Sequence, residues 1–224
     1  MSDASPTAGS EPAVFAVKDC ALIAIATGKQ DYTLSELRND LQSVGTDSIY
    51  YHFWGGLLQP RFEEREFNND FASWARHSLH DNRLAERLAV IDPMEYKDLE
   101  ELRSDLLDVI EEHLDSETAI TWMRALRPFE FIRSQIVVFD THRRLQQPDE
   151  LAQLIPQLSP SSIFYHFIDA RRRLSDSSDD FRVWLSAYNG RFDALCADLA
   201  GVDPYFGNLS ELRDQLTNIF NKHF

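Results

Sequence analysis

The chain has 224 residues, of which 43% are hydrophobic and 12% aromatic, a composition that excludes a disordered protein and supplies a sizeable core. Its 37 acidic and 22 basic residues give a formal charge of −15, which disfavours nucleic acid and membrane surfaces as partners. The two cysteines, Cys20 and Cys196, indicate no disulfide framework, and we recognise no secretory signal or membrane span. We therefore expect a compact cytoplasmic protein.

The chain opens with residues 1–12, which are small, polar and rich in proline and glycine, and which we expect to be disordered. An apolar run from Lys18 to Gly28 follows, and it is compatible with a buried helix or a buried strand. Its alanines favour a helix that ends at Gly28. The similar stretch from Phe131 to Thr141 is rich in β-branched residues and favours a strand.

Helices are predicted next. Thr33 and Glu36 have the spacing of a capping box, which indicates that a short helix begins there. Ser48 is placed to cap a second helix that runs from Ile49 to about Leu58, ahead of a proline.

Three more helical segments are predicted in the first half of the chain. One begins at Asp70 and continues through Leu79, and another carries its apolar face from Leu84 to Ile91. The last has the apolar stripe of a helix that packs on a core, with apolar residues three or four apart at Leu99, Leu102, Leu106, Val109 and Ile110.

A six-residue motif recurs along the chain. The sequence SIYYHF at 48–53 returns as SIFYHF at 162–167, and weaker similarity around the motif extends over about 95 residues of each copy in total. We interpret this as two copies of one helical unit, at 13–114 and 129–224, joined by a linker at 115–128. The predicted fold is mainly all-α, with at most a short strand pair where each repeat starts. The two units are expected to face each other across a pseudo-twofold axis, and a continuous helical stack is the alternative.

Several longer blocks support a family resemblance. The segments KDCALIAIATG, SIYYHFWGGLLQPRF, NNDFASWARHSLHD and RLAERLAVIDP in the first half, and FIRSQIVVFDT in the second, resemble an uncharacterised bacterial family of unknown function. The resemblance covers nearly the whole chain from Phe15. Some members of that family lie beside genes for trehalose or other glycosyl-transfer enzymes, so the resemblance implies an association with that metabolism. It transfers no catalytic residue.

Two matched histidines are the first candidates for chemistry. His52 and His166 recur with Asp70 and Asp180, and two histidines with two carboxylates across a twofold axis are suited to one metal ion or to acid–base catalysis. The alternative, which we favour, is structural: each imidazole lies at the edge of the core, with its ring bonded to a backbone carbonyl or to the matched aspartate.

His77 and His80 form a second histidine pair, found in the first repeat alone. Their spacing of three residues suits two metal ligands on one helix, and the alternative is an exposed helix end where histidines interact favourably with the helix dipole.

Differences between the two copies suggest where a single ligand binds. Candidate ligand-binding residues in the first copy are Trp54, Arg61, Phe62, Asn68 and Asn69, because aromatic, guanidinium and amide groups suit sugar or phosphosugar recognition. In the second copy the candidates are the basic run Arg171, Arg172 and Arg173, for which a solvated helix face is the alternative.

No sequence motif indicates a cofactor, since the chain has no glycine-rich phosphate loop, GxSxG, HExxH or CxxC signature. The expected function is a non-catalytic binding or regulatory protein whose partner is another protein or a carbohydrate-related small molecule. The alternative is a metal-dependent or acid–base enzyme built on the matched histidines and aspartates. No oligomeric state follows from the sequence.

Overall fold

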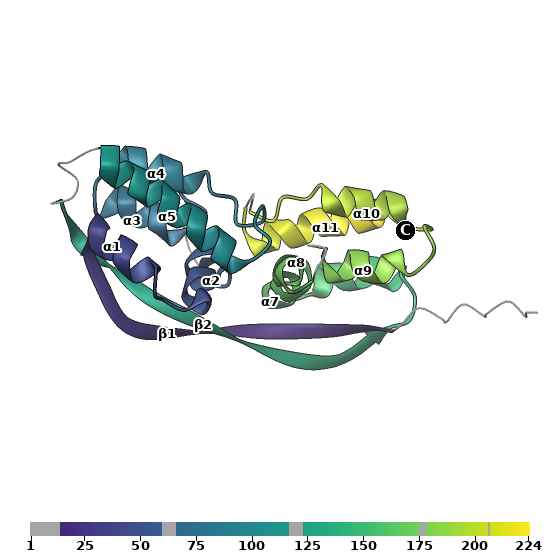
Figure 1. Ribbon diagram of the computed structural model, residues 1–224. Helices are drawn as coiled ribbons and strands as arrows, with labels where there is room; N and C mark the ends of the chain where they lie inside the picture. Colours follow the sequence, from purple (N-terminus) through teal and green to yellow (C-terminus); the bar gives the residue numbers. More distant parts are fainter. Residues whose placement is uncertain (1–13, 60–65, 117–122, 175–177, 206) are drawn as a thin grey trace, which may run out of the picture.

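The chain is organised around a long two-stranded antiparallel ribbon (Figure 1). Strand β1 (Phe15–Thr33) pairs with strand β2 (Arg124–Leu145), so that Phe15 lies opposite Leu145 and Thr33 lies opposite Arg124. The computed structural model describes residues 14–59, 66–116, 123–174, 178–205 and 207–224.

The prediction of a mainly all-α fold is wrong, because strands of 19 and 22 residues make the fold mixed α/β. The alanine-rich run of β1 has weak strand propensity of its own, but its residues pair with β-branched ones, as Ala21 does with Val137 and Leu22 with Ile136. Pairing with a distant strand therefore decides the conformation that local propensity leaves open. Strand β2 begins inside the segment that was interpreted as a linker, and the proposed domain boundaries stay a prediction.

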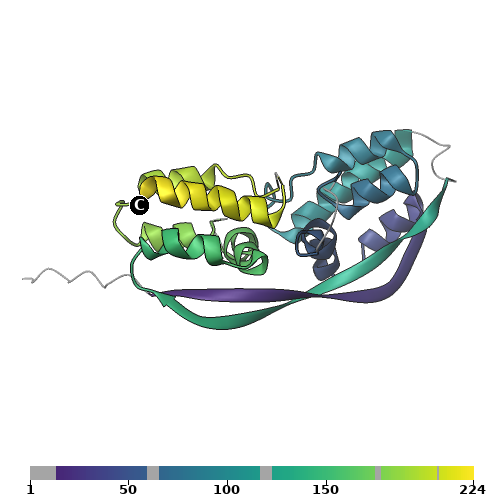
Figure 2. The same ribbon diagram turned by 180° about the vertical axis from the view of Figure 1, so that it is seen from behind.

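Two helical lobes lie on the same side of the ribbon (Figures 1 and 2). The first lobe contains α1 (Leu34–Leu41), α2 (Thr46–Trp54), the 3₁₀ turn η1 (Gly55–Leu57), α3 (Asp70–His77), α4 (Asn82–Ala89) and α5 (Leu99–Ser116). The second lobe contains α6 (Glu150–Leu154), the 3₁₀ turn η3 (Ile155–Gln157), α7 (Pro160–Ile163), the π-helical turn η4 (Phe164–Asp169), α8 (Ala170–Arg173), α9 (Asp180–Ser186), α10 (Asp193–Ala200) and α11 (Leu209–His223).

Local signals placed some helices correctly. The capping box at the start of α1 is confirmed: the Thr33 hydroxyl accepts from the N–H of Glu36, and the Glu36 carboxylate accepts from the N–H of Thr33. The apolar stripe of α5 is also confirmed as a helix. In contrast, α2 begins at Thr46, so Ser48 lies inside the helix and is not its cap.

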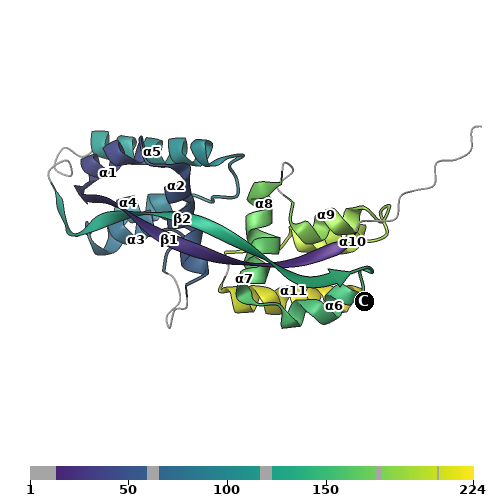
Figure 3. The ribbon, with the colours of Figure 1, turned by 90° about the horizontal axis from the view of Figure 1, so that it is seen from below.

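Each strand passes beneath both lobes (Figure 3). The start of β1 packs on the second lobe, where the ring of Phe15 lies 5.1 Å from the imidazole of His166. The start of β2 packs on the first lobe, where the ring of Phe129 lies 4.6 Å from the imidazole of His52. Each lobe is therefore completed by the strand that precedes the other lobe in the sequence. We call this arrangement the strand exchange.

The exchange joins the apolar interior into one cluster. Both lobes and the ribbon contribute buried side chains to it, including Phe15, Leu34, Phe53, Phe71, Phe131, Ile163, Phe181 and Phe220. Among the described residues, no helix is both long and apolar enough to cross a bilayer.

Matched irregularities interrupt the two strands. The hydroxyls of Thr27 and Thr141 each donate to a carbonyl oxygen of the opposite strand, at 2.7 and 2.6 Å. The residue that follows has a positive φ in both cases, 81° at Gly28 and 61° at His142. The sequence prediction that Gly28 ends a helix is therefore wrong, because its backbone freedom serves a left-handed position within β1.

Candidate functional site

In each lobe, side chains of the repeated motif bind the backbone of the strand that precedes the other lobe. In the first lobe the Ser48 hydroxyl donates to the carbonyl oxygen of Ile132 at 2.8 Å, and the N–H of Ile132 donates to His52 Nε2 at 3.2 Å. The other ring nitrogen, Nδ1, lies 3.0 Å from Asp70 Oδ2. We call Ser48, His52 and Asp70 the first clamp.

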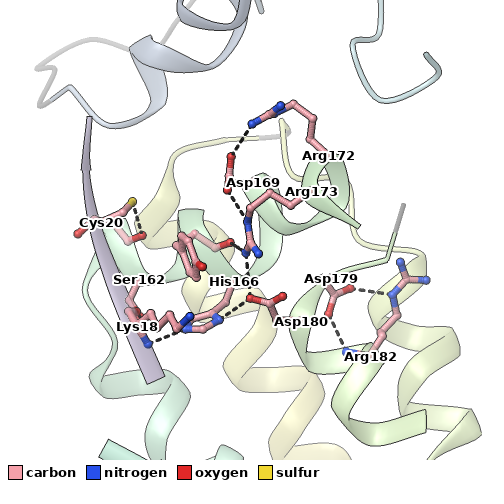
Figure 4. Close-up of polar contacts among 12 residues, drawn as sticks. Lys18, Cys20, Ser162, His166, Asp169, Arg172, Arg173, Asp179, Asp180 and Arg182 are labelled. Atoms are coloured by element: carbon pink, nitrogen blue, oxygen red, sulfur yellow. Dashed lines mark hydrogen bonds and ion pairs between the residues drawn. The ribbon is translucent and has the colours of Figure 1, made fainter. Parts of the chain in front are cut away.

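The second lobe repeats this arrangement (Figure 4). The Ser162 hydroxyl donates to the carbonyl oxygen of Lys18 at 2.7 Å, and the N–H of Lys18 donates to His166 Nε2 at 2.9 Å. His166 Nδ1 lies 2.7 Å from Asp180 Oδ2. We call Ser162, His166 and Asp180 the second clamp. In each clamp, two motif side chains bind both backbone polar groups of one residue of the exchanged strand.

The clamp geometry defines the tautomer of both histidines. Because Nε2 accepts a hydrogen bond from a backbone N–H, it carries no proton, and Nδ1 is the nitrogen that donates to the carboxylate. His52 and His166 are each 2% exposed, so both ring nitrogens are buried and engaged. The His52–Asp70 pair lies in the first lobe beside β2, and the His166–Asp180 pair lies in the second lobe beside β1. Among the described residues, no group of three or more histidine, cysteine, aspartate or glutamate side chains is arranged to hold a metal ion.

A pocket of about 390 Å³ opens beside the second clamp. Aromatic side chains, two cationic side chains, one carboxylate and the imidazole of the second clamp line it, from Phe15, Tyr165, Trp184, Lys18, Arg173, Asp180 and His166. The rings of Phe15 and Trp184 lie 5.2 Å apart. The pocket therefore combines flat apolar surface with charged groups, which is the usual character of a small-molecule site.

Arg173 is fixed at the edge of this pocket. Its Nε donates to Asp169 Oδ2 at 2.7 Å, and its Nη2 donates to Asp180 Oδ2 and to the carbonyl oxygen of Tyr165, both at 3.1 Å. The guanidinium carbon lies 4.1 Å from the centroid of the Tyr165 ring. Burial lowers the pKa of Arg173, but Asp180 and Asp169 outweigh burial and hold the pKa above its ordinary value. The group is therefore charged and held in one orientation.

The same carboxylates connect the pocket to the contact between the lobes. The Tyr50 hydroxyl of the first lobe donates to Asp169 Oδ1 of the second lobe at 2.9 Å. Arg172 also contacts both residues: its guanidinium carbon lies 4.7 Å from the centroid of the Tyr50 ring, and its Nη2 lies 3.5 Å from Asp169 Oδ1. Burial, aided by Asp169, raises the pKa of Tyr50 well above its ordinary value. The phenol therefore keeps the proton that joins the lobes.

Arg171 is half-buried and also packs against an aromatic ring, whereas Arg172 and Arg173 are exposed, so the interpretation of the basic run as a solvated helix face does not apply to Arg171. Its guanidinium carbon lies 4.3 Å from the centroid of the Phe167 ring, and its Nη2 lies 4.0 Å from Asp179 Oδ2. Burial lowers the pKa of Arg171 and raises the pKa of Asp179. Arg173 alone among the three arginines lines the pocket.

Three first-lobe candidates for ligand binding have structural contacts. Trp54 is buried and stacks on Tyr50, with 5.0 Å between the ring centroids. Asn69 caps α3 by accepting from the N–H of Ala72 at 2.8 Å, and Asn68 donates to the carbonyl oxygen of Ile91 at 3.0 Å. The structure brings none of these three residues to the pocket of the second lobe.

The remaining candidates lie at the surface or outside the described residues. His77 lies at the end of α3, with its Nε2 2.9 Å from Glu66 Oε2. His80 is exposed and has a positive φ of 60°. Arg61 and Phe62 fall within 60–65, outside the described residues.

Sequence reasoning missed most of the pocket. Phe15 and Lys18 of β1 meet Trp184 of α9 there, and none belongs to a recognisable catalytic pattern. One signal was present: the aligned repeats place Lys18 opposite Ile132, a cation opposite an apolar residue. A comparison of the two copies at that position would have indicated the asymmetry.

Comparison with known families and structures places this architecture. The model of a family described as a family of unknown function, DUF5752, matches residues 12–221. The chain belongs to the DUF5752 family. No curated protein matches the chain. Among solved structures, OrfY from Thermoproteus tenax is similar, with a TM-score of 0.80 and 22% identity over 95% of this chain and 97% of OrfY. At that identity the similarity establishes that this DUF5752 chain and OrfY share a fold.

Proposed function

We propose that this DUF5752 protein is a non-catalytic cytoplasmic binding protein whose second-lobe pocket takes a small carbohydrate-related ligand. The observation that carries the proposal is the pocket itself. Phe15 and Trp184 line it with aromatic surface that a sugar ring can contact, while Nη1 of Arg173 offers a donor for a hydroxyl group. This ligand class agrees with the metabolism that the family resemblance implies.

The state of the histidines supports a non-catalytic role. A general acid or base must reach a substrate proton, and in each clamp one ring nitrogen is bound to the strand and the other to an aspartate. The free thiols of Cys20 and Cys196 agree with a reducing compartment. A regulatory role is supported by the path from the pocket through Arg173 and Asp169 to the lobe contact.

A thermal-shift screen tests the proposal. The purified protein is heated with monosaccharides, disaccharides, sugar phosphates and nucleotide sugars, and at least one compound should raise the melting temperature in a saturable way. The variant Trp184→Leu should lose that rise. Trp74→Leu is the matched control, because Trp74 is equally buried at the aligned position of the first lobe.

Two outcomes would contradict the proposed function. If no compound of the panel stabilises the protein, the pocket has no carbohydrate-related ligand. If Trp184→Leu and Trp74→Leu respond to the ligand alike, binding takes place elsewhere on the chain.

A further inference from the structure

We propose that the ligand of the second-lobe pocket carries an oxyanion, a phosphate or a carboxylate, which binds between Lys18 and Arg173. The inference rests on the proposed function, because it names the chemical class of the ligand of the same site. It is carried by a difference between the two lobes, whose clamps are otherwise built alike.

Lys18 and Ile132 occupy equivalent places in the two lobes. Each has its N–H bound by a clamp histidine and its carbonyl oxygen bound by a clamp serine. The backbone interactions are therefore the same, and the side chains are what differ. The second lobe has an ammonium group where the first lobe has a hydrocarbon.

Arg173 and Gln59 form the second contrast. Arg173 lies over the ring of Tyr165, and in the first lobe Gln59 Nε2 donates to the hydroxyl of Tyr51, the aligned tyrosine, at 2.8 Å. A third contrast also makes the second lobe less acidic than the first, since Ala16 of the pocket aligns with Glu130. The second lobe thus has two cations where the first lobe has neutral side chains, and lacks one of its acids.

The charge of Lys18 has no partner among the residues that the structure describes. Its ammonium group makes no ion pair in the part of the chain that the structure describes, although the chain as a whole has a formal charge of −15. Its backbone is fixed by the second clamp, so the start of its side chain is fixed at the pocket wall. An ammonium group without a partner, beside aromatic surface, favours an anionic ligand.

Arg173 is oriented to complete the site. Asp169 and Asp180 bind its Nε and Nη2, which leaves Nη1 without a hydrogen bond to the described residues. Such a guanidinium is held in place before the ligand arrives, so little conformational entropy is lost when an oxyanion binds. Asp180 is bound by both His166 and Arg173 and offsets the charge of the guanidinium, so Lys18 supplies the cationic charge that the described carboxylates leave unpaired.

Tryptophan side-chain NMR provides the test, since Trp184 lines the pocket and Trp74 marks the aligned place in the first lobe. The full chain, labelled with ¹⁵N at tryptophan, is titrated with inorganic phosphate at constant ionic strength, which removes general screening effects. The indole signal of Trp184 should shift and saturate, while that of Trp74 should stay in place. Glucose 6-phosphate and glucuronate form two further arms that distinguish phosphate from carboxylate, and glucose is the neutral arm.

Two sets of variants sharpen the result. Lys18→Ile, which installs the residue of the first lobe, should weaken phosphate binding about tenfold, as expected for the loss of one charge-assisted hydrogen bond. Lys97→Ile removes the same charge from an exposed side chain and should leave binding unchanged. The double variant Ile132→Lys with Gln59→Arg should make Trp74 respond to phosphate.

The outcomes separate this inference from the proposed function. If glucose shifts the Trp184 signal as strongly as glucose 6-phosphate and glucuronate do, and Lys18→Ile changes nothing, the pocket binds neutral sugars and the oxyanion inference is wrong. If phosphate moves Trp74 and Trp184 alike, the effect is general and the inference is also wrong. If no compound of the carbohydrate panel binds, the proposed function fails together with the oxyanion inference that rests on it.

Discussion

At the scale of the residue, the motif histidines act as hydrogen-bond acceptors for a strand. Each neutral imidazole receives a backbone N–H at Nε2 and is held in that tautomer by an aspartate at Nδ1. The neighbouring serine takes the carbonyl group of the same strand residue, Ile132 or Lys18. Burial makes these bonds hard to replace, because a backbone N–H that loses its acceptor inside the protein is not solvated.

We predict that His52→Ala and His166→Ala each lower the free energy of unfolding by about 2–4 kcal/mol. The estimate combines an unsatisfied buried N–H with the cavity left by the ring. Urea denaturation followed by circular dichroism measures the change. His77→Ala is the control, and because its ring is exposed it should stay within about 0.5 kcal/mol of the parent protein. Equal losses in all three variants would refute the clamp.

The sequence predicted part of this site. The recurrence of the motif was evident, and the aspartate expected beside each histidine lies at Nδ1, whereas the backbone partner is an N–H and not the expected carbonyl. The identity of the partner was not predictable, because Ile132 lies 80 residues from His52 and Lys18 lies 148 residues from His166. A backbone partner also leaves no side-chain signature, since any residue except proline supplies the same N–H and C=O.

At the scale of the element, helices and strands differ in how far along the chain their stabilising partners lie. Helix α1 was predictable because Thr33 and Glu36 cap it from within four residues. Strand β1 was not, because its alanines take the extended form only when β2 supplies the partner hydrogen bonds. Both strands also contain a left-handed position, which is occupied by Gly28 in β1 and by His142 in β2.

We predict that His142→Gly raises the free energy of unfolding by about 0.5–1 kcal/mol. Glycine adopts a positive φ without the steric cost that His142 bears, and part of this gain is offset by the greater freedom of glycine in the unfolded chain. The reverse change, Gly28→His, should destabilise the protein, although open space surrounds the position where its Cβ would lie. Chemical denaturation of both variants measures the pair, and a stabilising Gly28→His would contradict the argument.

At the scale of the whole molecule, the strand exchange makes the two lobes depend on each other. The first lobe needs Phe129 and Phe131 of β2, and the second needs Phe15 and Val17 of β1. These four side chains are almost completely buried in the joint core. Neither lobe therefore has a complete interior from its own stretch of sequence.

We predict that a chain split within residues 117–122 gives two fragments that fold only together. Each fragment alone would expose the surface that the missing strand covers, so it should not form a folded monomer. Coexpressed fragments should purify as a one-to-one complex with the circular dichroism spectrum of the intact protein. Light scattering of each fragment provides the control, and a folded monomeric fragment would disprove the mutual dependence.

The strand exchange also constrains how such a gene can evolve. A substitution at Phe129 changes the packing of helices encoded in the other half of the gene, so compensating substitutions should arise across the midpoint of the chain. A recombinant that joins the first half of one family member to the second half of a distant one would mismatch both cores at once. Divergence of the two halves is therefore coupled, whereas a side-chain change at Lys18 leaves its backbone contacts with the second clamp in place.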